Sequence, residues 1–106
     1  FAELIRSNIR STDLAARIGG EEFCVVLSNS SARASAAIAE RIRAQTEAMT
    51  IRTGSASIQT TVSAGIAYAT GADTIQSLLI RADEALYEAK ASGRNRVKVS
   101  GLTLVA

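Results

Sequence analysis

A pair of glycines separates two segments that have the hydrophobic patterns of β-strands. Residues 14–18 (Leu-Ala-Ala-Arg-Ile) alternate as a half-buried strand does, and residues 23–27 (Phe-Cys-Val-Val-Leu) form a short apolar run typical of a buried strand. Glycine accepts the positive φ angles that a tight turn between antiparallel strands needs. Gly19-Gly20 therefore predicts a hairpin that carries two acids, Glu21 and Glu22, at its tip.

The composition of this hairpin tip is compatible with two different roles. Adjacent carboxylates repel each other unless a cation or water separates them, and bare glycine amides can approach a phosphate closely. The pentapeptide Gly19–Phe23 is thus consistent with a metal and triphosphate site, and equally with an ordinary exposed turn. The chain has no histidine and one cysteine, which excludes an ordinary zinc site and an internal disulfide. A metal here would be a hard cation such as magnesium, held by oxygen atoms.

Composition is that of one soluble, cytoplasmic domain. The chain has 106 residues, a 47% hydrophobic content and a net charge of +2. That charge is too small to indicate a nucleic-acid or membrane partner, and no apolar run is long enough to span a bilayer. Phe1 and Phe23 have no stacking partners visible in the sequence, so an aromatic platform for DNA or RNA is not predicted.

The remaining segments predict helices that alternate with strands. We expect a helix ending near Ile9, a helix from Ser30 or Ser31 to Met49, a loop over 52–57, a long strand over 58–69, a helix capped by Asp73 and stopped by Gly93, and a last strand at Val97 and Val99. The expected core stripes are Ala34, Ile38, Ile42 and Met49 in the second helix, and Ile75, Leu79, Ala82, Leu86 and Ala89 in the third. This order predicts an α+β fold in which helices pack on a largely antiparallel sheet.

Five motifs in a fixed order carry a resemblance to a known family. They are Arg10-Ser-Thr-Asp13, Arg17-Ile-Gly-Gly-Glu-Glu-Phe23, Ser63-Ala-Gly-Ile-Ala67, Arg81-Ala-Asp-Glu-Ala-Leu-Tyr-Glu-Ala-Lys90 and Gly93-Arg-Asn-Arg-Val97. In this the chain resembles the GGDEF family of diguanylate cyclases. The resemblance implies a partial GGDEF domain over residues 1–100, with a C-terminal extension at 101–106, and an incomplete ferredoxin-like fold of the nucleotide cyclase and polymerase palm type.

The resemblance also implies a chemistry and its residues. Two GTP molecules would condense to cyclic di-GMP with release of pyrophosphate, in a homodimer that uses Mg²⁺ or Mn²⁺ and is driven by an upstream sensor domain. Glu21 matches the family's metal-binding and hydroxyl-activating acid, and Glu22 its second catalytic acid. Gly19 and Gly20 match positions where the backbone approaches the nucleotide. Lys90 and Arg94 match contacts to the terminal phosphates, although cations at a helix C-terminus are often there only for the helix dipole.

A second implied site would bind the product. Arg10 and Asp13 match the family's product-inhibition motif, in which arginine and aspartate bind cyclic di-GMP, and Arg41 matches a secondary arginine. The alternatives are a local Arg10–Asp13 salt bridge of little energetic value and an ordinary surface arginine. The side chains of Cys24, Tyr68 and Tyr87 are expected to pack against the core. Asn95 and Arg96 are expected to be structural, and Asp83 and Glu84 to form pairs on the surface or between helices.

The family's first strand and following helix, with a metal-binding aspartate and the residues that contact guanine, have no counterpart in the sequence. We therefore expect the chain by itself to be unstable without a partner segment and inactive as a cyclase. Two other functions stay open. One is a cyclic di-GMP receptor that has lost catalysis, which the intact pair of acids argues against. The other is a structural or interaction module.

Overall fold

The computed structural model describes residues 1–19, 22–27, 31–69 and 71–99. Three helices and six strands follow one another in these ranges, which confirms the predicted α+β class. The elements are α1 (Ala2–Asn8), β1 (Leu14–Gly19), β2 (Glu22–Val26), α2 (Ala32–Ala48), β3 (Thr50–Thr53), β4 (Ala56–Gln59), β5 (Ala64–Ile66), α3 (Ile75–Ala91) and β6 (Val97–Val99).

In the described part of the chain, the strands pair as three separate two-stranded ribbons. The β1–β2 ribbon is antiparallel, as expected. The β3–β4 ribbon, which was not predicted, is also antiparallel, while β5 and β6 are parallel. The parallel pair was not predicted. It follows from the connection between the two strands, because α3 crosses over the ribbon and returns the chain in the same direction.

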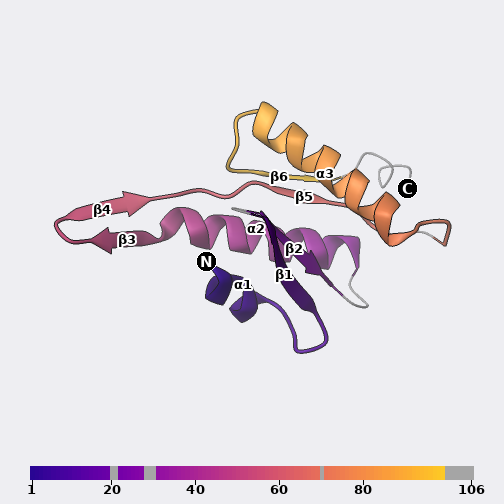
Figure 1. Ribbon diagram of the computed structural model, residues 1–106, viewed down its shortest axis with the longest axis horizontal. Helices are drawn as coiled ribbons and strands as arrows, with labels where there is room; N and C mark the ends of the chain where they lie inside the picture. The colour runs from indigo at the N-terminus through magenta and orange to yellow at the C-terminus, as the bar shows by residue number, and fades with distance from the viewer. Residues whose placement is uncertain (20–21, 28–30, 70, 100–106) are drawn as a thin grey trace.

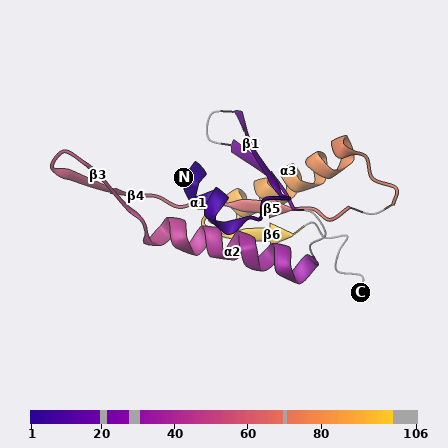
Figure 2. The same cartoon turned by 90° about the horizontal axis from the view of Figure 1, so that it is seen from below.

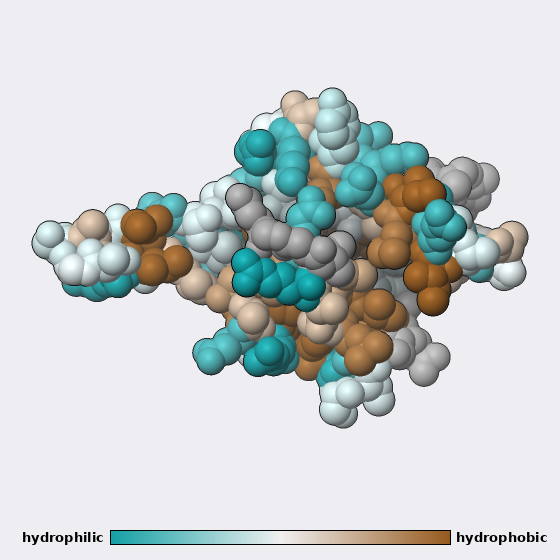
Figure 3. Space-filling view, viewed as in Figure 1, coloured by the Kyte–Doolittle hydropathy of each residue, from teal (hydrophilic) through white to brown (hydrophobic). Residues whose placement is uncertain are grey.

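The helices cover both faces of the parallel ribbon. Figures 1 and 2 show β5 and β6 lying between α2 on one side and α3 on the other, and both helices contact both strands. The short helix α1 packs against α2. The β3–β4 ribbon projects away from these layers, and in Figure 3 hydrophobic side chains lie on this arm. Ile51 and Ile58, which face each other across the arm, are both exposed.

Small residues form the contact between α3 and β5. Ala85 and Ala89 of α3 are buried, and a Cβ atom on Gly65 of β5 would collide with the backbone of Ala82 and Leu86. The other buried hydrophobic residue among those described is Ile5. Glycine and alanine here allow the helix backbone to lie directly on the strand.

The predicted core stripes are partly wrong. Ile75 is 79% exposed and Leu79 is 45% exposed, while Ala85, which was not in the stripe, is buried. The 17 residues of α3 extend about 25 Å, whereas the three residues of β5 extend only about 10 Å, so the strand covers one part of the helix. In α2, Ala34 is exposed and Ile38, Ile42 and Met49 are half-buried, and the fully buried positions are the polar Ser35 and Thr46.

The helix caps confirm one prediction and correct another. The Ser31 side chain accepts a hydrogen bond from the Ala34 amide, as an N-cap of α2 should. At α3 the cap is Thr74, which forms a capping box with Ser77, and the predicted cap Asp73 is wrong. The Asp73 carboxylate instead accepts from the Ser77 hydroxyl and pairs with Arg81.

The region between α2 and β5 was also mispredicted. The expected loop over 52–57 is instead the central part of the β3–β4 hairpin, whose two-residue turn uses Gly54 at a φ of 62°. The expected long strand over 58–69 is divided, because Ile58 and Gln59 end β4 and the chain pairs again only at Ala64. No helix within the described ranges has the length and apolar character needed to cross a membrane.

Candidate functional site

The hairpin that carries the acidic motif forms as predicted. Leu14 pairs with Val26 and the register continues to Arg17 opposite Phe23, after which it shifts so that Gly19 pairs with Glu22. Such an irregularity adds a residue to one strand and changes the direction of the chain at the tip. Gly19 and Glu22 therefore lie opposite each other at the end of the ribbon, while Gly20 and Glu21 lie outside the described residues.

The donor chemistry at this tip fits a hard cation. Glu22 is the first residue of β2 and is exposed, so its carboxylate can reach a bound ion or a phosphate-bound metal. Within the described ranges, no three histidine, cysteine or acidic side chains converge as a ligand set. Glu21, the expected metal ligand, lies outside the described residues, and the neighbouring Glu22 is an oxygen donor of the kind that Mg²⁺ prefers.

The second group of predicted nucleotide-binding residues lies at the C-terminal end of α3. Lys90 is in the last turn of the helix, and Arg94 lies in the turn that follows; both are exposed. Gly93 has a φ of 126°, which confirms the predicted left-handed stop. The Arg94 amide donates to the Ala89 carbonyl at 2.9 Å and the Gly93 amide to Lys90 at 3.5 Å, the pattern of a Schellman motif. This motif brings the two cations to one helix end.

Arg43 of α2 was not identified from the sequence, yet it connects to the same turn. Its guanidinium donates to the Asn95 side chain at 2.8 Å and pairs with Glu40 at 2.5 Å and Glu47 at 3.5 Å. The hydrogen bond from Arg43 lowers the pKa of the Glu40 carboxyl. The sequence signal that could have found Arg43 is the spacing of acids at i−3 and i+4 on one helix.

Arg10 and Asp13 form a compact turn between α1 and β1. The Asp13 carboxylate accepts from the Arg10 amide at 2.9 Å and pairs with the Arg10 guanidinium at 3.5 Å, and the Asp13 amide donates to the Arg10 carbonyl at 3.0 Å. The Asp13 side chain is fully buried, whereas that of Arg10 is 58% exposed. Asp13 thus shapes the turn from inside, and Arg10 presents its guanidinium to solvent.

Arg41 lies in the same neighbourhood. Its guanidinium donates to the side-chain oxygen of Asn8, and at 3.4 Å to the Asn8 carbonyl, two residues before Arg10. The Asn8 amide in turn donates to Gln45 and to the Leu4 carbonyl, both at 2.8 Å. The structure therefore joins Arg10 to Asp13 and connects Arg41, through Asn8, to the segment that leads into their turn. Sequence reasoning missed Asn8.

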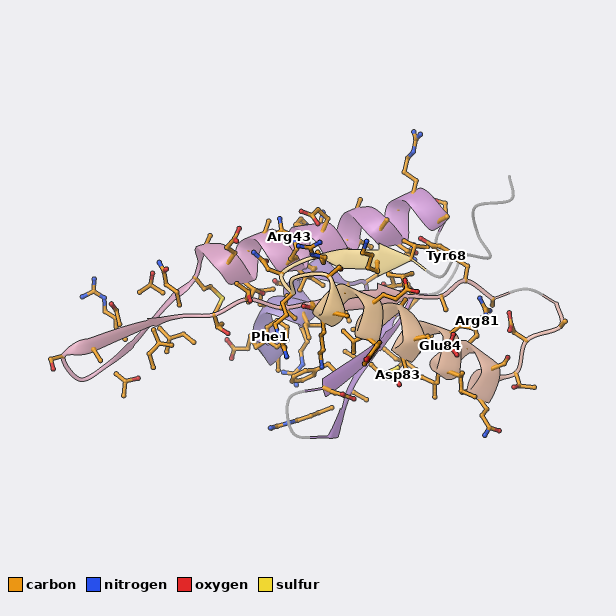
Figure 4. All side chains as sticks on the ribbon, turned by 90° about the horizontal axis from the view of Figure 1, so that it is seen from above. Phe1, Arg43, Tyr68, Arg81, Asp83 and Glu84 are labelled. Atoms are coloured by element: carbon orange, nitrogen blue, oxygen red, sulfur yellow. The ribbon has the colours of Figure 1, made fainter. Side chains whose placement is uncertain are left out.

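The aromatic and acidic residues outside these groups give mixed outcomes. Asp83 and Glu84 are exposed on α3, as expected (Figure 4). Tyr68 is half-buried and its hydroxyl donates to the Ala32 carbonyl, and burial raises the pKa of the phenol. Tyr87, expected to pack, is 74% exposed. Cys24 is half-buried rather than buried, because its side of the β1–β2 ribbon is only partly covered.

Comparisons with known proteins agree with these motifs. A family model described as diguanylate cyclase, GGDEF domain, matches residues 1–96. Diguanylate cyclase A of Treponema denticola is 47% identical over 100 residues, which are 93% of this chain and 27% of that protein.

Two solved structures are similar in fold as well as sequence. The GGDEF domain of DgcB from Caulobacter crescentus, crystallised in complex with c-di-GMP, is 33% identical with a TM-score of 0.89, over 93% of this chain and 60% of that one. The active GGEEF domain of a diguanylate cyclase from Vibrio cholerae is 32% identical with a TM-score of 0.83, over 93% of this chain and 63% of that one. The chain spans less than two thirds of each of these relatives. With its family match over residues 1–96, the chain belongs to the GGDEF domain family of diguanylate cyclases.

Proposed function

We propose that this chain is the part of a diguanylate cyclase that supplies the acidic turn and the phosphate-binding cations. The observation that carries the proposal is an intact Gly-Gly-Glu-Glu-Phe motif at the tip of a hairpin in a chain of this family. The similar domain from Vibrio cholerae has the same GGEEF form and is described as active. A receptor without catalysis has no chemical need for two adjacent acids.

The reaction joins two GTP molecules through two phosphodiester bonds. The 3′-oxygen of each GTP attacks the α-phosphorus of the other, the bond to the β-phosphate oxygen breaks, and pyrophosphate leaves as the hydroxyl proton is lost. Mg²⁺ or Mn²⁺ bound at the acidic turn would offset the triphosphate charge and lower the pKa of the attacking hydroxyl. Glu21 and Glu22 would hold that cation, and their carboxylates provide an acceptor for the proton.

The remaining site residues bind and orient the substrate. Gly19 and Gly20 let the backbone approach the nucleotide, since no Cβ atom stands in the way. Lys90 and Arg94 would meet the terminal phosphates and stabilise the charge of the departing pyrophosphate. Because each domain holds one GTP, two copies must face each other, and a sensor domain elsewhere in the protein would control their meeting. The cytoplasm supplies the GTP.

The Arg10 turn is proposed as a regulatory site for the product. Arg10 presents an exposed guanidinium, Arg41 lies beside the same turn through Asn8, and the similar domain of DgcB was crystallised with c-di-GMP. A planar guanidinium binds phosphate and stacks on guanine well. Product that accumulates would bind here and slow the enzyme.

The activity is tested with the natural full-length protein, incubated with GTP and Mg²⁺ and followed by chromatography of cyclic di-GMP. Glu21→Gln removes a charge from the acidic turn and should lower the rate at least about a hundredfold, the scale of a lost electrostatic stabiliser. Glu84→Gln is the matched control, since it removes the same charge from an exposed position on α3. A Glu21→Gln rate within a few-fold of the parent contradicts the proposed role, and product binding without turnover in the parent would favour a receptor.

A further inference from the structure

The turn after α3 contains more left-handed backbone than ending a helix requires. Gly93, Arg94 and Asn95 have φ angles of 126°, 61° and 47° in succession. A helix end needs one such residue, and Gly93 provides it without a steric penalty. For residues with a Cβ atom the left-handed region is sterically unfavourable, although asparagine tolerates it better than most. Strained backbone of this kind persists only where surrounding contacts hold it.

The contacts that hold this turn converge on Asn95. Its backbone N–H donates at 3.0 Å to the hydroxyl of Ser63, the residue just before β5. Its side chain accepts from Arg43 at 2.8 Å and donates to Glu47, both on α2. Asn95 is thus connected to two separate elements of the fold.

Arg43 is itself fixed in place. Its side chain is 18% exposed, and Glu40 and Glu47 pair with it from the two neighbouring turns of the same helix. Figure 4 shows Arg43 on the side of α2 that faces the chain between α3 and β6. The turn is therefore held against a rigid helix by a short network of charged hydrogen bonds.

Within the part of the chain that the structure describes, the side chain of Arg94 has no anchor comparable to the one that holds Asn95. The backbone amide of Arg94 donates to Ala89 at 2.9 Å, its carbonyl accepts from the Arg96 side chain at 3.0 Å, and its side chain is exposed. The direction in which its guanidinium leaves the protein is consequently set by the backbone that Asn95 fixes. Lys90, one turn earlier, is directed by the helix itself.

We propose that Asn95 is a positioning residue, clamped by Arg43 and Glu47, that aims Arg94 at the terminal phosphates of the bound nucleotide. This inference rests on the proposed function, in which Arg94 contacts those phosphates. Fixing a cation in advance removes part of the ordering cost of binding a triphosphate, so the clamp contributes to affinity without touching the ligand.

The test measures nucleotide binding by calorimetry in metal-free buffer, so that no turnover occurs, with GTP and GMP as probes and the natural full-length protein. Asn95→Ala should weaken GTP binding about tenfold, the scale of one charged contact, and leave GMP binding unchanged because GMP lacks the terminal phosphates. Arg94→Ala should do the same. The Arg94→Ala/Asn95→Ala double variant should bind GTP no more weakly than Arg94→Ala alone, because Asn95 acts through Arg94.

Two further variants separate positioning from simple loss of stability. Asn95→Gly removes the side chain that Arg43 and Glu47 hold, so it should lose GTP affinity as Asn95→Ala does. Because glycine adopts the left-handed backbone without strain, Asn95→Gly should unfold at a higher denaturant concentration than Asn95→Ala. Asp73→Ala breaks a polar cluster at the opposite end of α3 and should lower stability with GTP affinity retained. Equal loss of GTP and GMP binding in Asn95→Ala, or additive effects with Arg94→Ala, would overturn the inference. An Arg94→Ala variant that binds GTP normally would instead contradict the phosphate role in the proposed function.

Discussion

The ring of Phe1 meets the ring of Phe23 edge to face, with the centroids 5.3 Å apart and the ring planes at 84°. This pairing was not visible in the sequence, because residues 22 positions apart are brought together only by the fold. Phe1 precedes α1, and Phe23 lies in β2 directly after the acidic turn. The pair is a direct contact between the N-terminal segment and the hairpin that carries the acids.

Removing this ring contact should cost measurable stability. In a double-mutant cycle of Phe1→Leu and Phe23→Leu, followed by urea unfolding, we expect a coupling free energy of about 0.5–1.5 kcal/mol, since edge-to-face pairs contribute that much beyond burial. Phe1→Leu combined with Ile75→Ala, at the exposed start of α3 and far from the N-terminus in Figure 1, provides a control cycle with expected coupling near zero. Strictly additive effects of the two phenylalanine changes would show that the rings do not interact.

Gly65 should not tolerate a methyl group. Because a Cβ atom there would collide with the backbone of Ala82 and Leu86, Gly65→Ala must push α3 away from β5, at a cost of about 1–3 kcal/mol in unfolding free energy. Gly71→Ala is the matched control, since nothing lies within 4 Å of its added Cβ, and its effect should stay within about 0.5 kcal/mol. Denaturant unfolding of both variants gives the comparison. Equal stabilities would mean that α3 and β5 are farther apart than described.

The phenol of Tyr68 should ionise only above its ordinary pKa. Burial raises that pKa from 10.0, so the folded state holds the proton more tightly than the unfolded state does. Its contribution to stability is therefore complete below about pH 10 and is lost as the pH rises from there through the folded pKa. Absorbance titration of a Tyr87→Phe variant observes Tyr68 alone, because the chain has two tyrosines. A midpoint at or below pH 10 in the folded protein would contradict the burial of this ring.

Arg10→Ala should weaken product binding and leave turnover intact. A lost charge-assisted contact corresponds to about 2 kcal/mol, which calorimetry with cyclic di-GMP on the natural full-length protein would detect. Progress curves at rising product concentration should show less inhibition. Arg33→Ala, an exposed cation near the start of α2, is the control and should change neither quantity. Unchanged product affinity in Arg10→Ala would reduce the Arg10–Asp13 pair to a local salt bridge, and lost turnover would mean that Arg10 supports the hairpin or the active site.

Local sequence signals predicted the elements whose cause is local. Gly19-Gly20 marked the hairpin, Ser31 the start of α2, and Gly93 the end of α3, because a turn, an N-cap and a left-handed stop each depend on one or two residues. The two segments that carry the candidate site, the acidic hairpin and the turn after α3, were predicted for the same reason, since their motifs lie on these turns.

Features that depend on contacts between distant segments were missed. The exposure of Ile75 could not be predicted from the apolar stripe of α3. A stripe shows which face of a helix is apolar, and it does not show how much of that face a short strand such as β5 covers. Asn95 was expected to be structural, but its partners on α2 could not be named, because they lie 48 and 52 positions earlier in the chain. Thr74 replaced Asp73 as the cap because Arg81 pairs with the aspartate, an interaction that only the folded helix creates.

The projecting β3–β4 arm is a place where residues can be added to the chain without changing the geometry of the site. Each of its residues is exposed, and its two-residue turn at Gly54-Ser55 lies at the far end from the helix layers. Extra residues inserted there add only a slowly growing loop-closure entropy, and they displace neither α2 nor α3. A fluorescent peptide or affinity tag placed in this turn would therefore report on the protein in solution while the acidic hairpin and the Arg94 turn keep their positions.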